Sequence, residues 1–336
     1  MEPKNIQLTA SEMASLWNQY LFDTMSICFF KYALEHIEDE EIRGLYHHAL
    51  EIAESHIKKL KEFFEGENYP VPHGFTEDDV NPKATRLFQD PFYLNYLYIM
   101  TLQGLTGYGL SVGTSIREDL RKYFMECNSE AMDIFDKTIG IMLEKGIYTR
   151  PPTLNQPESV DFVKEQSFLT GWFGERRPLT AMEIGDITFN SNKMQLHVAL
   201  KLAFSQVVQS NKVRKYIQRG LRITDKHLDE FEDVLREEKL NSPMSWQSHV
   251  TDSTEPPFSD RLMMYQVQLS TQIAIAFYGT ALSVNSRRDL AAKYVALTGE
   301  LAKYAEDGMK LMIDCGWFEQ PPMASDRRNL AKGKKI

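Results

Sequence analysis

The two halves of this chain repeat each other. Leu8–Glu12 (LTASE) recurs 171 residues further on as Leu179–Glu183 (LTAME). Further identities keep the same order at a shift of 171 or 170, and they include His56 with His227, Tyr108-Gly109 with Tyr278-Gly279, Glu130 with Glu300, Gly146 with Gly316, and Pro151-Pro152 with Pro321-Pro322. Matches that stay in order along a whole copy indicate one fold used twice, with a one-residue slip in a loop.

Each copy carries the apolar spacing of long helices. In the first copy, Leu16, Tyr20, Ile27, Phe30 and Leu34 follow one another at helical intervals, which is typical of a helix that faces a bundle core. Strand patterns are nearly absent. Two long helices precede a connection that contains proline and glycine, and two more helices follow it. This order predicts an all-α fold of two tandem ferritin-like four-helix bundles related by internal duplication.

The repeat also sets the expected domain boundaries. We expect a first bundle over 1–152 and a second bundle, with a polar C-terminal tail, over 179–336. The segment between them, 153–178, contains Phe162 and Trp172 among other apolar residues. Because this composition is too apolar for a free linker, we expect the segment to pack across the junction of the bundles.

Composition excludes several classes of protein. The 336 residues include 38 basic and 47 acidic ones, a net charge of −9, which argues against a nucleic-acid-binding surface spread over the chain. No apolar run approaches the roughly 18–20 residues of a membrane span, and the N-terminus lacks the apolar core of a signal peptide. Three cysteines without a C-x-x-C pair fit a reducing compartment. We therefore expect a cytoplasmic protein with no nucleic-acid partner.

The histidines test the chemistry that a ferritin-like bundle usually carries. A di-iron centre needs Glu-x-x-His on two of the four helices, because positions i and i+3 share a helix face. The residue three positions before each of the eight histidines is not acidic, and the H-E-x-x-H zinc motif is absent. The sequence therefore disfavours an ordinary di-iron centre.

His56 and His227 are the histidines that match between the copies, and apolar residues flank both at i±4. Such a residue is either a hydrogen-bonded core histidine or a metal ligand. Asp23 lies on the inward stripe of the first helix, level with about position 55 if the first two helices are antiparallel, so we expect Asp23 to touch His56. The second copy has Met194 instead. Asp23, His56 and His227 are therefore candidate ligands of iron or another divalent metal.

The third helix of the first copy is rich in glycine. Gly104, Gly107, Gly109 and Gly113 fall within ten residues, although each glycine costs helix stability. Such residues let a neighbouring helix approach closely, and they can also leave space beside the helix. A small-molecule or lipid pocket under this helix is thus a further hypothesis.

Several strings of residues resemble a known family. They are Gly74–Asn81 (GFTEDDVN), Gln166–Gly174 (QSFLTGWFG), Pro257–Met264 (PFSDRLMM), Tyr304–Gly308 (YAEDG) and Gly316–Pro322 (GWFEQPP). The chain resembles a tandem-repeat family of unknown function from endospore-forming bacteria, which is ferritin-like and distantly similar to spore coat protein F. The resemblance covers nearly the whole chain. It implies a fold and an association with spores, and it supplies no catalytic residues.

Three functions follow as hypotheses. The first is a non-enzymatic structural or interaction protein, similar to spore-coat-associated proteins, which binds other proteins or itself; the missing di-iron ligand set motivates it. The second is a divergent metal-binding bundle that uses Asp23 and His56, together with an acid from the third or fourth helix. The third is binding of a small molecule or lipid in the bundle core.

Overall fold

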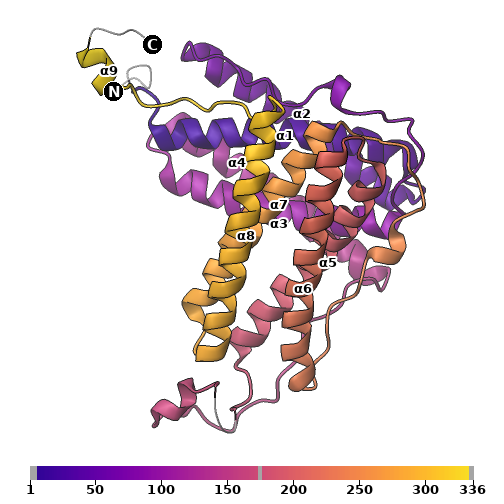
Figure 1. The fold of residues 1–336 in the computed structure, drawn as a ribbon, viewed down its shortest axis with the longest axis vertical. Helices are drawn as coiled ribbons and strands as arrows, with labels where there is room; N and C mark the ends of the chain where they lie inside the picture. Colours follow the sequence, from indigo (N-terminus) through magenta and orange to yellow (C-terminus); the bar gives the residue numbers. More distant parts are fainter. Residues whose placement is uncertain (1–5, 173–175, 333–336) are drawn as a thin grey trace.

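The computed structural model describes residues 6–172 and 176–332 of the chain (Figure 1). Within these ranges the chain forms helices and two isolated β-bridges but no strand, so the predicted all-α fold is confirmed. None of these helices has both the length and the apolar character that crossing a membrane requires. The last residues of the predicted polar tail, 333–336, lie outside the described ranges.

Four long helices form each half, and the halves match helix for helix. The first half contains α1 (Ala10–His36), α2 (Glu40–Gly66), α3 (Asp90–Thr114) and α4 (Glu118–Glu144). The second half contains α5 (Ala181–Val207), α6 (Asn211–Glu237), α7 (Asp260–Val284) and α8 (Arg288–Asp314). The short elements are η2 (Glu77–Asp79), η3 (Gln166–Leu169), η4 (Gln247–His249) and α9 (Arg327–Ala331). Matching lengths of 27, 27, 25 and 27 residues and the pairing of α1 with α2, α3 with α4, α5 with α6 and α7 with α8 confirm two four-helix-bundle repeats.

One buried glutamate caps two helices in each bundle. Glu12 and Thr9 form a reciprocal capping box at the start of α1, and the second oxygen of Glu12 accepts the backbone N–H of Arg117 at 2.8 Å, at the start of α4. Glu183 repeats both roles in the second bundle, where it accepts the backbone N–H of Arg287 at 3.0 Å. Because the first N–H groups of a helix lack partners within it, this contact explains why the LTASE-like string recurs.

The crossover loops of the two bundles meet at the junction. The loop between α2 and α3 pairs antiparallel with the loop between α6 and α7, through the bridges Val80–Phe258 and Phe88–Val250. The 170-residue shift turns each bridge into the other. The two bundles are therefore related by a pseudo-two-fold axis, the internal counterpart of an isologous dimer. In Figure 1 the helices of the first bundle cross those of the second.

Two pairs of equivalent residues contact each other on this axis. The Gln266 amide donates to the Tyr96 hydroxyl at 2.5 Å, and the Thr85 backbone N–H donates to the Glu255 carboxylate at 2.8 Å; each pair is separated by 170 residues. Phe29 stacks on Tyr96 with ring centroids 3.8 Å apart, within an apolar cluster that draws buried residues from both bundles. One core therefore runs through the junction.

The connecting segment differs from the expectation that it packs across the junction. The side chains of Phe162 and Val163 are 85% and 63% exposed. Among the described residues of the segment, packing contacts occur in its later part, where Arg177 lies 4.0 Å above the Phe168 ring and pairs with Glu183 at 2.8 Å. These contacts attach the segment to the end of the second bundle. The division of the chain at residues 152 and 178 stays a prediction.

Candidate functional site

A buried histidine of the first bundle lies between two carboxylates. His56 on α2 is 6% exposed. Its Nδ1 atom lies 3.3 Å from Oδ2 of Asp23 on α1, and its Nε2 atom lies 2.7 Å from Oε2 of Glu130 on α4. The structure thus brings together Asp23 and His56 and adds an acid from the fourth helix.

Cys127 belongs to the same cluster, although no sequence motif marks it. Donor atoms of His56, Cys127 and Glu130 lie within 4.8 Å of one another. Cys127 and Glu130 are three residues apart on α4, so both side chains lie on one helix face. A search for Glu-x-x-His does not find this pair, because its residues are arranged as Cys-x-x-Glu. The sequence signal that could have indicated Glu130 is its identity with Glu300 in the second copy.

The second bundle brings its matching histidine to fewer partners. Nε2 of His227 lies 3.0 Å from the Glu300 carboxylate, and Nδ1 lies 3.2 Å from the Tyr278 hydroxyl. Met194 and Leu297 occupy the positions that Asp23 and Cys127 occupy in the first bundle. His227 is therefore not joined to Asp23 or His56 in one site, and its surroundings differ from those of His56.

These surroundings shift the pKa values of the two histidines in opposite directions. Burial alone lowers the pKa of His56, but its polar contacts with Asp23, Cys127 and Glu130 outweigh burial and raise this pKa to about 12. Burial dominates at His227 and lowers its pKa, although the Glu300 carboxylate acts in the other direction. Without a bound metal ion, His56 is therefore protonated at neutral pH, whereas His227 is neutral.

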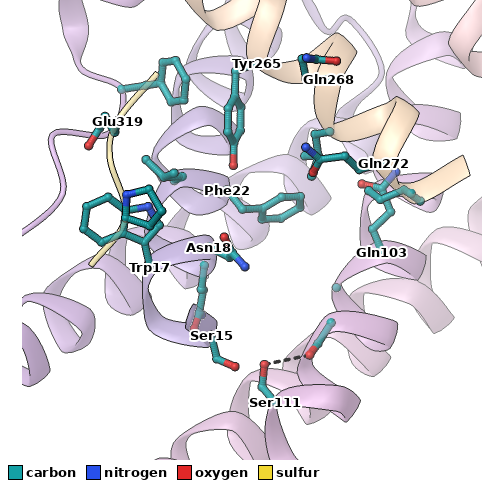
Figure 2. Close-up of a pocket in the computed structure, with 18 of the residues that line it drawn as sticks. Ser15, Trp17, Asn18, Phe22, Gln103, Ser111, Tyr265, Gln268, Gln272 and Glu319 are labelled. Carbon is teal, nitrogen blue, oxygen red and sulfur yellow. Dashed lines mark hydrogen bonds between the residues drawn. The ribbon is translucent and has the colours of Figure 1, made fainter. Parts of the chain in front are cut away.

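A cavity of about 450 Å³ lies beside the first-bundle cluster (Figure 2). Helices α1, α3, α7 and α8 line it together with residues 317–321, which follow α8 and which we call the strap. Gln19 belongs to this lining, and its amide also donates to the Cys127 sulfur at 3.6 Å. Tyr108 lines the cavity as well, and its ring centroid lies 6.1 Å from that of His56. The cavity and the cluster therefore share a wall.

The cavity is mainly apolar and carries neutral polar groups. Its aromatic lining includes Trp17, Phe22, Phe75, Tyr265 and Trp317. Figure 2 shows the amides of Asn18, Gln103 and Gln272 around Phe22. The charged residues of the lining are Arg261 and Glu319, which lie 3.4 Å apart as an ion pair. A few placed polar groups in an apolar hollow are typical of a small-molecule site.

Three positions of the cavity lining differ between the two copies. Asn18, Phe22 and Gly107 line the cavity, and the matching residues of the second bundle are Phe189, Lys193 and Phe277. There the two phenylalanine rings meet edge to face, with centroids 5.0 Å apart. The Lys193 ammonium lies 3.6 Å from the Phe277 centroid. Bulky side chains thus stand in the second bundle where the first has a glycine and a short amide.

The strap is anchored to the first bundle by one carboxylate. Glu319 accepts the backbone N–H groups of His73 and Gly74 at 2.8 and 2.9 Å. Gly74 has a φ of +60°, and a β-carbon there would lie 2.7 Å from the Thr24 hydroxyl. Only glycine fits this turn without strain. Thr149 occupies the matching place after the first bundle, so this anchor exists on one side only.

The fold and the site define a duplicated four-helix-bundle protein with a buried His–Cys–carboxylate cluster and a cavity beside it. The chain belongs to the DUF3231 family, described as a protein of unknown function, whose profile matches residues 1–160 and 167–330. This match confirms the family that the sequence strings indicate.

Two further comparisons add little about function. A comparison with curated protein sequences finds no match. Among solved structures, the chain is similar to a Bacillus halodurans C-125 protein described as a candidate spore coat protein, with 21% identity and a TM-score of 0.42. This similarity covers 46% of the present chain and 100% of the other chain. A likeness at this level does not bear on function.

Proposed function

We propose that this protein binds a small, neutral and largely apolar molecule in the cavity between its bundles. The observation that carries the proposal is the difference between Gly107 and Phe277. On α3, Gly107 lines the open cavity. On the equivalent helix α7, Phe277 stands at the matching position and packs in an aromatic cluster. An open cavity is costly because its walls lose van der Waals contacts, and a ligand restores those contacts.

The lining indicates the chemistry of the ligand. A volume of about 450 Å³ suits a molecule of drug-like or medium-chain lipid size. The amides of Asn18, Gln103 and Gln272 can both donate and accept hydrogen bonds, which suits a hydroxyl or carbonyl group. Arg261 and Glu319 pair with each other, so a charged ligand would lose its hydration without gaining a free counter-charge. A neutral amphipathic molecule fits best.

Filling the cavity tests this proposal. A β-carbon at Gly107 meets no atom within 4 Å, so Gly107→Phe can place a ring where the second bundle has one. We expect this variant to bind the neutral dye Nile red at least about 20-fold more weakly than the wild-type chain, since displacing a buried aromatic-sized volume costs about 2 kcal/mol or more. Dye fluorescence and quenching of Trp17 and Trp317 measure the binding.

A matched variant separates occupancy of the cavity from damage to the helix. Gly109 lies on the same helix, is exposed, and is outside the lining, so Gly109→Phe should leave dye binding within about twofold. Equal losses in both variants, or tight dye binding by Gly107→Phe, would contradict the proposal. As a test of ligand charge, decanol should displace the dye at a concentration at least about tenfold lower than decanoate does.

The strap gives a second prediction for the same cavity. Glu319→Ala removes both backbone hydrogen bonds that hold the strap. We expect about a tenfold loss of Nile red affinity, because hydrogen bonds to charged groups contribute about 1.5–3 kcal/mol and the strap forms one wall of the cavity. The neighbouring exposed residue provides the control: Gln320→Ala should bind the dye as the wild type does. If Glu319→Ala bound it equally well, the strap would have no part in the site.

The other expectations from the sequence stay predictions. A structural or interaction role similar to that of spore-coat-associated proteins, self-association, a cytoplasmic location and spore association have no structural observation that favours them. The ferritin-like relationship of the bundles also stays a prediction.

A further inference from the structure

We infer that the first bundle binds one divalent transition-metal ion between His56, Cys127 and Glu130. This inference is independent of the ligand proposed for the cavity. The three side chains offer an imidazole nitrogen, a sulfur and a carboxylate oxygen within 4.8 Å of one another. They come from α2 and α4, two helices that contact each other in the bundle. Their positions are therefore fixed by helix packing and not by a loop.

The donor types select the class of metal. Thiolate and imidazole donors favour zinc-like and iron-like ions over magnesium or calcium, which prefer oxygen ligands alone. A thiolate and a carboxylate together balance the two charges of such an ion. The ion takes the place of the His56 proton, because an imidazole binds a metal in its neutral form. Three protein ligands leave one position for water in a tetrahedral site.

The distances allow an ion with small side-chain movements. Ion–ligand distances of about 2.0–2.3 Å place tetrahedral donors about 3.5 Å apart. The contact of 2.7 Å between His56 Nε2 and Glu130 Oε2 must therefore open slightly. The Glu130 side chain is 41% exposed, so it has room to move and gives an ion a path from solvent. Cys127, by contrast, is 1% exposed and holds its place in the core.

Asp23 has the position of a residue that orients a metal-binding histidine. It faces Nδ1, the ring nitrogen opposite the one that would bind the ion, at 3.3 Å. Asp23 is 3% exposed, and its Oδ2 atom has no hydrogen bond of good geometry within the described part of the chain. A carboxylate behind the imidazole fixes the tautomer and strengthens the ligand. Asp23 is therefore a positioning residue and not a direct ligand.

The second bundle provides an internal comparison. His227 keeps a carboxylate neighbour in Glu300, but Met194 and Leu297 remove the orienting acid and the sulfur. Two donors, with the Tyr278 hydroxyl and not a carboxylate behind the imidazole, make a weaker site. We therefore infer that His227 does not bind the ion.

Titration of the full chain with Co²⁺, followed by absorption, tests the inference. We expect one Co²⁺ per chain, with visible bands of a four-coordinate ion and a near-ultraviolet charge-transfer band from the Cys127 thiolate. Cys127→Ser should remove the charge-transfer band, whereas Cys315→Ser, at an exposed cysteine, should leave it unchanged. Zn²⁺ added afterwards should displace the cobalt.

Histidine variants identify the ligand set. His56→Gln should abolish binding, His227→Gln should leave it unchanged, and Asp23→Ala should weaken it about 10–100-fold while keeping the charge-transfer band. Circular dichroism shows which variants remain folded. If His56→Gln does not fold, the comparison of Cys127→Ser with Cys315→Ser tests the inference. No Co²⁺ binding by the folded wild type, a band that survives Cys127→Ser, or equal effects of His56→Gln and His227→Gln would each overturn the inference.

Discussion

Replacing Gly308 with alanine is expected to destabilise the second bundle by about 2–3 kcal/mol, because it adds a methyl group where the core has no room. A β-carbon at Gly308 would lie 2.2 Å from the Tyr216 hydroxyl oxygen and 2.4 Å from the Gln268 amide nitrogen. The reciprocal change, Gly220→Ala, would put a methyl group 2.0 Å from the Tyr304 hydroxyl oxygen. Urea unfolding followed by circular dichroism measures the loss.

The two tyrosines cannot easily move aside. Their rings stack with centroids 4.3 Å apart and an angle of 5° between the planes. The Tyr216 hydroxyl donates to the Tyr304 carbonyl at 2.9 Å, and the Tyr304 hydroxyl donates to the Tyr216 carbonyl at 3.2 Å. Each ring is thus held between its partner and the opposite helix. Displacing it would break a buried hydrogen bond, which costs about 1–3 kcal/mol.

A third glycine distinguishes crowding from a general effect of helix glycines. Gly299 lies on α8, the same helix as Gly308, and a β-carbon there meets no atom within 4 Å. Gly299→Ala should therefore stabilise the chain by up to about 1 kcal/mol, since alanine is the better helix former. If Gly308→Ala were as stable as Gly299→Ala, the close approach of α6 and α8 would be wrong.

Local patterns were sufficient to predict the helices and one contact of the cluster. The apolar spacing predicts a long first helix, and the structure adds that Thr9 and Glu12 cap its start and that Glu12 also caps α4. The apolar stripe of the first helix, read with an antiparallel second helix, places Asp23 beside His56, and the two lie 3.3 Å apart. Both results depend on periodicity and on neighbours in sequence, which a sequence displays directly.

Contacts between distant helices could not be predicted in the same way. Cys127 reaches His56 because α4 packs beside α2, and periodicity does not say which helices are neighbours. The cavity depends on how the two bundles sit together, since α7 and α8 supply part of its lining. The glycine-rich third helix indicated available space, but the pairing of the crossover loops determines what lies opposite it.

The two copies have diverged in the chemistry of their cores. Helix α5 buries three basic residues at four-residue intervals, Lys193, His197 and Lys201, all 3% exposed or less. The first bundle has Phe22, Ser26 and Phe30 at the matching positions. The second bundle thus carries buried basic groups, and the first carries the cluster of Asp23, His56, Cys127 and Glu130. Duplication has left the helices alike while the buried polar groups became specific to each copy.

This divergence predicts a large stabilising substitution. Lys201→Met should stabilise the second bundle by about 3 kcal/mol at pH 7, because burial lowers the pKa of Lys201 to about 7 and an unfolded lysine titrates near 10.4. Between pH 7 and 10.4, the lysine of the unfolded chain therefore keeps a proton that Lys201 of the folded chain has already released. Wild-type stability should rise with pH across this window, and the advantage of Lys201→Met should shrink towards pH 10. Urea unfolding at pH 7 and 9.5 measures both effects.

The environment of Lys201 makes methionine a suitable replacement. The Lys201 ammonium donates to the Thr224 hydroxyl at 2.8 Å, and that hydroxyl itself donates to the Gly220 carbonyl at 2.8 Å, so Thr224 keeps a partner after the substitution. Lys212→Met, at an exposed position, should change stability by less than about 0.5 kcal/mol at either pH. A Lys201→Met variant that is less stable than the wild type at pH 7 would mean that Lys201 stays charged and is stabilised in place. In that case the partner would be Asp225, the carboxylate whose charge raises the pKa of Lys201. Asp225→Asn should then lower the free energy of unfolding as well.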